Sequence, residues 1–437
     1  MRQVSKGVVK LLFLFVLFTL VFWVYYTSNV RDRGDSRYVL HVADSILRQG
    51  NTDLDEYQFL IHQEGIYESR VLIMNGHIYS VYPMGTSLLS VPFVAYFNSW
   101  YKSFVAPVGI DKFVVLTQTD KLDIFLAALF STLAILFIFL IGIEFLPWPI
   151  SFMVSLAFAF GTTAWTSGAR TLWPHGPTML MLSMGIWLLL KAKREVGFAV
   201  LAGFPLAYSF VIRPTNIFPL IALSVYVLLA YRKLFPFYFI VCLSVLMPLI
   251  YYNVRIYQTP LSPFYYPQGI SMGAHNHSLL LSWEGLIGQL MSPNRGLFIF
   301  SPFLIFSFIG VFTLFKLKKA MMIDYLLIFS IISHWLIISY YRSWWGGWVF
   351  GPRYFTDILP ILAYFFIRFV QNLIVWRHKI LKVLTVLVLL ASVVVSIWIE
   401  HAGATYYATG YWNGNPNDID YYHERVWNWH DLQFLRR

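Results

Sequence analysis

Residues 11–26 read LLFLFVLFTLVFWVYY, an uncharged run preceded by Arg2, Lys6 and Lys10. The run is long enough to cross a bilayer and lacks a small-residue cleavage site, so it predicts a spanning helix rather than a signal peptide. The positive charge before it predicts a cytoplasmic N-terminus. The topology of the remaining chain follows from this starting point.

The composition of the whole chain is typical of a membrane protein. Of its 437 residues, 58% are apolar and 12% are charged, whereas soluble domains carry roughly 45–50% apolar and about 25% charged residues. The lone Cys242 excludes a disulfide framework and a multi-thiolate metal site. The net charge of +11 has no soluble basic domain to carry it, so we expect no nucleic-acid partner.

Ten further apolar runs lie at 122–143, 149–168, 176–190, 197–212, 215–231, 235–253, 297–315, 325–341, 358–376 and 380–399. Together with the first run they predict an all-α polytopic membrane protein with eleven transmembrane helices, forming one domain over residues 1–437.

The charges between these helices agree with a cytoplasmic N-terminus and an extracytoplasmic C-terminus. Alternating the spans leaves only Glu144, Glu195 and Asp324 as acidic residues inside. The basic residues on that side are Arg2, Lys6, Lys10, Lys191, Lys193, Arg194, Arg232, Lys233, Lys316, Lys318, Lys319, Arg377, Lys379 and Lys382. This excess of cations in short inner loops predicts a multi-pass protein of the plasma (inner) membrane whose chemistry faces outward.

Three outward segments are long enough to build a site: the first outer loop at 28–121, the segment 254–296 and the tail at 401–437. In the first loop, a helical period from Tyr38 to Leu47 ends at Gly50, and a second helix is expected over 85–101. We interpret both as helices lying at the membrane interface. The alternative for the second is a full span, which would invert the downstream charge asymmetry.

The first outer loop carries a family resemblance. The first helix is followed by Gly34-Asp35-Ser36-Arg37-Tyr38, then a helix ending Leu47-Arg48-Gln49-Gly50, then Tyr82-Pro83 before a second helix. This order resembles GT-C-type glycosyltransferases, polytopic enzymes that use polyprenyl-phosphate sugars and include protein O-mannosyltransferases and the lipid A aminoarabinose transferase. The segments 292–296 and 351–354 are similar to a less-studied branch.

The chain departs from that family in two places. Several members have an acidic pair where this chain has Gly34-Asp35, and an acidic residue where it has Pro174-His175. Asp35 is therefore the one acidic residue of this chain at the position of the family's acidic pair. We expect no metal cofactor, although the sequence does not exclude Mg²⁺ or Mn²⁺.

Transfer from a lipid-phosphate sugar needs a base for the acceptor hydroxyl and cations for the departing phosphate. Asp35 is our candidate base, with a helix N-cap as the alternative role. The candidate phosphate ligands are outward cations, each of which has a snorkelling or interfacial role as its alternative. They are Arg37, Arg170, His175, Arg213, Arg295 and Arg353.

Acidic and aromatic residues supply candidates for the acceptor and the sugar. Asp53, Asp55 and Glu56 form an acidic cluster, of which we assign Asp55 and Glu56 to hydroxyl binding, with a merely solvated cluster as the alternative. Tyr82, Trp344, Trp345 and Trp348 complete this set. For the tryptophans, the alternative is the aromatic belt of any membrane protein.

The sequence thus predicts a membrane glycosyltransferase that moves a sugar, with inversion, from a polyprenyl-phosphate donor to an extracytoplasmic glycan, lipid or protein hydroxyl. Two other classes remain open: a transporter of lipid-linked substrates and a non-catalytic envelope assembly protein. A transporter is expected to show internal repeats and several charges within its helices. This chain shows no repeat and one clear interior charge, Arg368.

Overall fold

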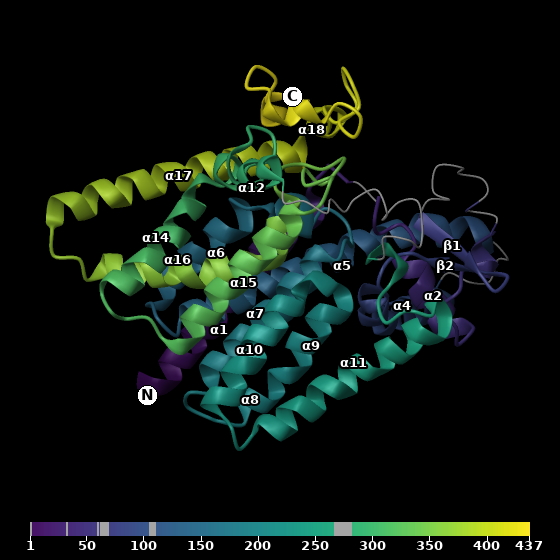
Figure 1. Cartoon of the computed structure of the whole chain (residues 1–437), viewed down its shortest axis with the longest axis horizontal. Helices are drawn as coiled ribbons and strands as arrows, with labels where there is room; N and C mark the ends of the chain where they lie inside the picture. Colours follow the sequence, from purple (N-terminus) through teal and green to yellow (C-terminus); the bar gives the residue numbers. More distant parts are fainter. Residues whose placement is uncertain (1, 32–33, 59–60, 62–69, 105–110, 266–281) are drawn as a thin grey trace.

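The computed structural model describes residues 2–31, 34–58, 61, 70–104, 111–265 and 282–437. Parts of the expected outer segments, at 62–69, 105–110 and 266–281, lie outside this description. Helices dominate the fold (Figure 1). The helices that fall in the expected apolar ranges are α1 (Arg2–Thr27), α5 (Asp111–Gly142), α6 (Trp148–Phe160), α7 (His175–Lys191), α8 (Phe198–Leu201), α9 (Gly203–Ile212), α10 (Ile217–Ala230), α11 (Phe235–Tyr257), α13 (Leu297–Phe300), α14 (Ile305–Lys316), α15 (Met322–Ser339), α16 (Leu359–Ile374) and α17 (Lys379–Thr405).

Helical structure occupies each of the eleven expected ranges, which confirms a polytopic helical membrane protein. Six helices of the described residues are long and apolar enough to span a bilayer, and shorter apolar helices make up much of the rest. The number of eleven spans and the orientation of the termini stay predictions. The two termini lie at opposite ends of the bundle (Figure 1).

Two expected helices are interrupted where the sequence disfavours a continuous helix. The range 149–168 breaks after Phe160 at Gly161, and a π-helical turn, η3 (Ala164–Gly168), follows. Thr162 helps this break because its hydroxyl donates to the carbonyl of Phe158. The range 297–315 breaks at Pro302, whose ring has no N–H to continue the helix. A short 3-10 turn, η6 (Pro302–Leu304), joins α13 to α14.

The first outer loop folds beside the bundle (Figure 1). It contains α2 (Val39–Arg48), the 3-10 turn η1 (Asp55–Tyr57), β1 (Val71–Met74), β2 (His77–Ser80) and α4 (Gly85–Phe104). The two expected helices are therefore present, and Gly50 ends the first one with a left-handed φ of +72°. Their depth in the membrane stays a prediction. The helical fold class is confirmed, and the loop adds a short antiparallel hairpin that was not expected, in which β1 pairs with β2 in the register Val71 to Ser80.

The core of the bundle is formed by α5, α7 and α16, which contribute many of its buried side chains. Gly310 of α14 lies against the carbonyl of Phe365 in α16, and a Cβ at that glycine would come within 2.3 Å of the oxygen. This close approach requires glycine. At the end of the bundle away from Asp35, Glu144 pairs with Lys191 at 3.1 Å and with Arg194 at 3.1 Å. Two loops that the sequence assigns to the same side of the membrane, at Glu144 and at 191–194, therefore lie in contact.

The last residues form a compact unit that we call the C-terminal cap, residues 406–437. It contains α18 (Tyr407–Tyr411), η8 (His423–Trp427) and η9 (Gln433–Leu435), and it lies above the bundle at the end opposite the N-terminus (Figure 1). Buried Arg295 holds it to the bundle, donating to Asn413 and Gln433, each at 2.7 Å. The cap thus covers the C-terminal end of α12 (Trp283–Met291) and the turn that leads into α13.

Candidate active site

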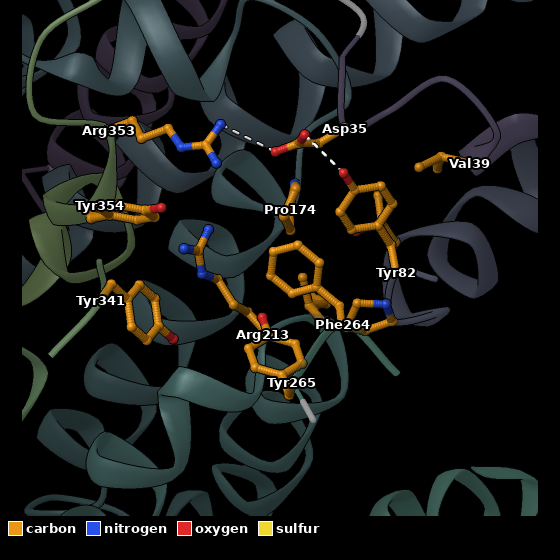
Figure 2. Close-up of a pocket in the computed structure, with 13 residues that line it drawn as sticks. Asp35, Val39, Tyr82, Pro174, Arg213, Phe264, Tyr265, Tyr341, Arg353 and Tyr354 are labelled. Atoms are coloured by element: carbon orange, nitrogen blue, oxygen red, sulfur yellow. Dashed lines mark hydrogen bonds and ion pairs between the residues drawn. The ribbon is translucent and has the colours of Figure 1, made fainter. Parts of the chain in front are cut away.

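Asp35 lies between α1 and α2, where it is held by two side chains (Figure 2). Its Oδ1 accepts a hydrogen bond from the Tyr82 hydroxyl at 3.0 Å, and its Oδ2 pairs with Arg353 Nη1 at 3.1 Å. Burial raises the pKa of the Asp35 carboxyl, but Arg353, Arg70 and the Tyr82 hydrogen bond outweigh burial and hold that pKa below its usual value of 3.8. Asp35 is therefore a carboxylate at neutral pH.

Arg353 begins η7 (Arg353–Ile358), the 3-10 segment that leads into α16. Its guanidinium lies 5.2 Å from the ring centre of Trp173 and 5.2 Å from that of Tyr354. The side chain passes close to Gly346, which has a φ of +83° and would place a Cβ 3.2 Å from Arg353 Cγ. Glycine at this position therefore allows the left-handed backbone conformation and also leaves room for the Arg353 side chain.

A second arginine is fixed by a buried carboxylate. Arg213, between α9 and the 3-10 turn η4 (Pro214–Asn216), pairs through Nε with Asp357 Oδ2 at 2.8 Å. His175 Nδ1 lies 2.7 Å from Asp357 Oδ1, and His175 Nε2 lies 3.2 Å from Arg213 Nη1. His175 can donate from Nδ1 to Asp357, while Arg213 Nη1, which is also 3.1 Å from Nδ1, is nearly equidistant from the two ring nitrogens and so lies over the imidazole ring. Asp357 and His175 therefore fix the direction of the Arg213 fork.

Both arginines line one cavity, which we call the inner cavity (Figure 2). It has an empty volume of about 770 Å³, and Asp35 is the only acidic residue among its described lining residues. The rest of its wall is apolar or aromatic, including Val39, Ile212 and Phe264, the last from η5 (Pro263–Tyr265). The inner cavity thus combines an apolar wall with two guanidinium groups, features that suit a lipid chain and a phosphate.

A wider outer cavity lies against the same residues. Its empty volume is about 2300 Å³, including the open mouth, and its wall extends to the C-terminal cap. Trp344, Trp345 and Trp348 line it, as the sequence predicted for a binding surface, and so does Tyr82. Six residues line both cavities: Asp35, Tyr82, Phe264, Tyr341, Arg353 and Tyr354. Asp35 and Arg353 therefore stand at the wall between the two spaces.

The other expected phosphate ligands do not line either cavity. Arg295 donates to the carbonyls of Trp345, Asn294 and Gly347 as well as to the two cap side chains. All of its donors are directed to protein acceptors, so we correct its expected role to a structural one. Arg170 is buried with its guanidinium 3.6 Å from where a Cβ on Gly410 would lie. Arg37, partly buried before α2, also lines neither cavity.

The acidic cluster of the first loop is also away from the cavities, which removes Asp55 and Glu56 from the expected acceptor site. Asp55 Oδ2 lies 2.6 Å from His77 Nδ1, and Glu56 accepts from Ser45. The Asp55 hydrogen bond raises the pKa of His77. Asp53, Asp55 and His77 have ligand atoms within 4.8 Å of one another, as a metal site would. The hydrogen bond between Asp55 and His77 explains this close approach equally well without a metal ion.

Sequence reasoning missed Asp357 and Arg70. Asp357 was detectable as a carboxylate immediately before the apolar run 358–376, where a charge is costly without a partner. It provides the acidic residue next to His175 that the Pro174-His175 turn lacks. Arg70, which lines the outer cavity and lowers the Asp35 pKa, follows a stretch without helical or strand periodicity, so no sequence signal pointed to it.

The fold belongs to a known class of membrane protein. ArnT, an aminoarabinose transferase from Cupriavidus metallidurans in its apo state, superimposes with a TM-score of 0.51 at 14% identity, over 92% of this chain and 70% of that one. The apo oligosaccharyltransferase of Archaeoglobus fulgidus gives 0.50 at 11% identity, over 97% of this chain and 60% of that one. Both are GT-C glycosyltransferases. The chain therefore has the GT-C fold.

No protein-family model and no curated protein matches the sequence. The structural likeness defines the fold, while the chemistry has to be argued from the site itself.

Proposed function

We propose that this protein is a membrane glycosyltransferase that moves a sugar from a polyprenyl-phosphate donor to a hydroxyl of an extracytoplasmic acceptor. The observation that carries the proposal is the position of Asp35, at the wall shared by an arginine-containing apolar cavity and an open polar cavity. A donor in the inner cavity and an acceptor in the outer cavity would meet at this carboxylate. The GT-C fold of two glycosyltransferases supports the same reading.

In the proposed reaction, the acceptor hydroxyl loses its proton to Asp35 as its oxygen attacks the anomeric carbon. The bond from that carbon to the phosphate oxygen breaks, and the electron pair leaves with the lipid phosphate. Arg213 and Arg353 bind the negative charge that develops there. A single displacement inverts the anomeric centre, since no second carboxylate lines the described inner cavity to act as a nucleophile.

Tyr82 and Asp357 have supporting roles in this proposal. Tyr82 donates to the Asp35 oxygen and directs the carboxylate, while Asp357 keeps Arg213 extended toward the inner cavity. The two arginines supply the positive charge at the leaving group, so we propose no metal in the reaction. The lipid bilayer and the polyprenyl-phosphate sugar are the partners that the inner cavity would require.

The test is Asp35→Asn in purified, correctly folded protein, assayed with a polyprenyl-phosphate sugar and a chelator. Loss of a general base costs about 10²–10⁴-fold in rate, so transfer should fall by at least about 100-fold. Asp53→Asn, outside both cavities, is the matched control and should keep the wild-type rate. Undiminished transfer by Asp35→Asn would reject this function for Asp35. Activity of wild-type protein that disappears with the chelator and returns with magnesium would reject the metal-free scheme.

The two alternative classes make different predictions for the same variant. A scaffold protein does not need the Asp35 charge, and a transporter would move the lipid-linked sugar without releasing free polyprenyl phosphate. Product analysis by mass spectrometry separates them, because only the transferase forms a new glycosidic bond together with the free lipid phosphate.

A further inference from the structure

The outer cavity has a wall built by the C-terminal cap, and this wall indicates what the acceptor is. Trp345 Nε1 donates to Asp420 Oδ1 at 3.1 Å, and Trp348 Nε1 donates to Asp418 Oδ1 at 3.1 Å. Both indoles are therefore fixed by the same short stretch of the cap. The aromatic-belt interpretation of these tryptophans does not account for two specific carboxylate partners.

Trp348 is an exposed ring held in one orientation. It keeps 46% of its surface exposed, although its N–H is bonded. Gly414 lies directly against the ring, since a Cβ there would come within 2.6 Å of Trp348 Cη2. An exposed indole that is held by its N–H and by contact with Gly414 can offer apolar surface to a ligand with little further loss of side-chain freedom.

Polar groups line the same cavity as Trp348. Asp420, Arg342 and Glu284 line the cavity beside the tryptophans, together with Ser343 and His423. His423 stacks on Trp345 with ring centres 5.0 Å apart and planes 10° from parallel. An apolar platform beside carboxylate and guanidinium groups suits a sugar ring, which has a C–H face and hydroxyls at its edge.

The charges of the cavity are balanced. Its described cations are Arg70, Arg342 and Arg353, and its described anions are Asp35, Glu284 and Asp420. A phosphorylated acceptor would require an excess of cations, as found in the inner cavity. An extended peptide would require open backbone groups, yet the carbonyls of Trp345 and Gly347 both accept from Arg295.

We propose that the outer cavity binds an uncharged carbohydrate acceptor, with Trp348 as the stacking platform and Asp420 as a hydroxyl ligand. The inference rests on the proposed function and names the acceptor class for that same site. It makes the C-terminal cap a determinant of acceptor specificity.

The direct test measures binding without turnover. Saturation-transfer NMR is recorded on purified protein with neutral tetrasaccharides of mannose, glucose, galactose and rhamnose, with a phosphorylated counterpart of each, and with a serine-rich peptide. We expect at least one neutral tetrasaccharide to bind more tightly than its phosphorylated form and than the peptide. Preference for a phosphorylated form or for the peptide, or the absence of any neutral binder, would overturn the proposal.

Variants then locate the site. Trp348→Ala should weaken binding of the neutral tetrasaccharide about tenfold, which corresponds to about 1.4 kcal/mol, and Trp348→Phe should restore most of it. Trp429→Ala is the matched control, because Trp429 is a 57% exposed cap residue that lines neither cavity. Equal binding by Trp348→Ala and wild type would reject Trp348 as the platform.

A third measurement separates this inference from the proposed function. Release of free sugar from a polyprenyl-phosphate donor in the absence of acceptor reports on Asp35 and the arginines, and Trp429→Ala, which lines neither cavity, should release free sugar at the wild-type rate. A wild-type protein that binds neutral tetrasaccharide through Trp348 but never turns over donor would contradict the proposed function and leave the carbohydrate site standing. Normal donor turnover without any carbohydrate binding would support the proposed function and reject the carbohydrate site.

Discussion

Gly346 gives the sharpest prediction, because replacing it by alanine acts on Arg353 without changing any charged residue. At a φ of +83°, alanine costs about 1–2 kcal/mol of backbone strain. The new Cβ would lie 3.2 Å from Arg353 Cγ and 3.3 Å from its Cδ and Nε, so the arginine has to move by a few tenths of an ångström. The Trp173 and Tyr354 rings flank the guanidinium and limit where it can go.

The pair that this shift changes is Arg353 to Asp35, already at 3.1 Å. Losing about half of a charged hydrogen bond of about 1.5–3 kcal/mol removes about 0.75–1.5 kcal/mol, which corresponds to roughly a 4- to 13-fold effect. We therefore expect kcat for transfer from a polyprenyl-phosphate sugar to fall by roughly 4- to 13-fold in Gly346→Ala. The assay is initial-rate transfer by protein in detergent micelles, with the melting temperature of the same sample recorded by intrinsic fluorescence.

Gly50→Ala is the matched control. Gly50 has a φ of +72° and nothing within 4 Å of its would-be Cβ, so its alanine variant carries the same kind of strain without a contact. Both variants should lose similar stability, and only Gly346→Ala should lose activity. Equal activity in the two variants at equal melting temperature would refute the argument that Gly346 positions Arg353.

Three further predictions concern the same cavity. Arg213→Lys keeps the charge but loses the planar fork, so the KM for the donor should rise about tenfold in the transfer assay. Asp357→Asn leaves the buried Arg213 without its counter-ion, so the free energy of unfolding should fall by about 3–5 kcal/mol in denaturant titrations. The Asp35 pKa lies below its usual value, so wild-type kcat/KM should persist as the pH falls toward 3.8. Arg353→Met removes the cation and leaves burial to raise that pKa, so the acid limb should move to higher pH.

Each of these predictions has an outcome that contradicts it. An unchanged donor KM in Arg213→Lys would show that a point charge is enough. Wild-type stability of Asp357→Asn would mean that Arg213 finds another counter-charge. The active form of Asp35 is the carboxylate, which is lost as the pH falls through the Asp35 pKa. An acid limb that stays in place in Arg353→Met, where this pKa is raised, would therefore assign the titration to a group other than Asp35.

Much of the fold was predictable from apolar runs, and the exceptions have local causes. The hairpin at 71–80 was missed although Asn75-Gly76 stands between its strands, with φ values of +52° and +84° that suit a tight hairpin turn. A strand of four residues is too short to show an alternating pattern beside strongly apolar helices. The break at Gly161 was missed for a similar reason, since hydropathy does not register a single glycine.

The site was predictable only where residues act close to an expected helix end. Asp35 was our candidate base and Arg213 and Arg353 were candidate phosphate ligands, and the structure places all three in the wall of one cavity. Arg295 looked the same in sequence, yet its partners lie 118 and 138 residues further along the chain. An arginine can bind a phosphate only if its N–H groups are not already bonded to protein acceptors. Those acceptors can be distant in the sequence, so the residues around the arginine do not reveal them.

The Arg295 contacts have a consequence for the biogenesis of the protein. At about 5–20 residues per second, synthesis of the 138 residues from Arg295 to Gln433 takes roughly 7–28 s. Throughout that interval the Arg295 guanidinium lacks its cap acceptors and needs other partners, such as water. The outer cavity therefore acquires its full wall only after the last residues of the chain have been made and have packed onto the bundle, so the site is completed last.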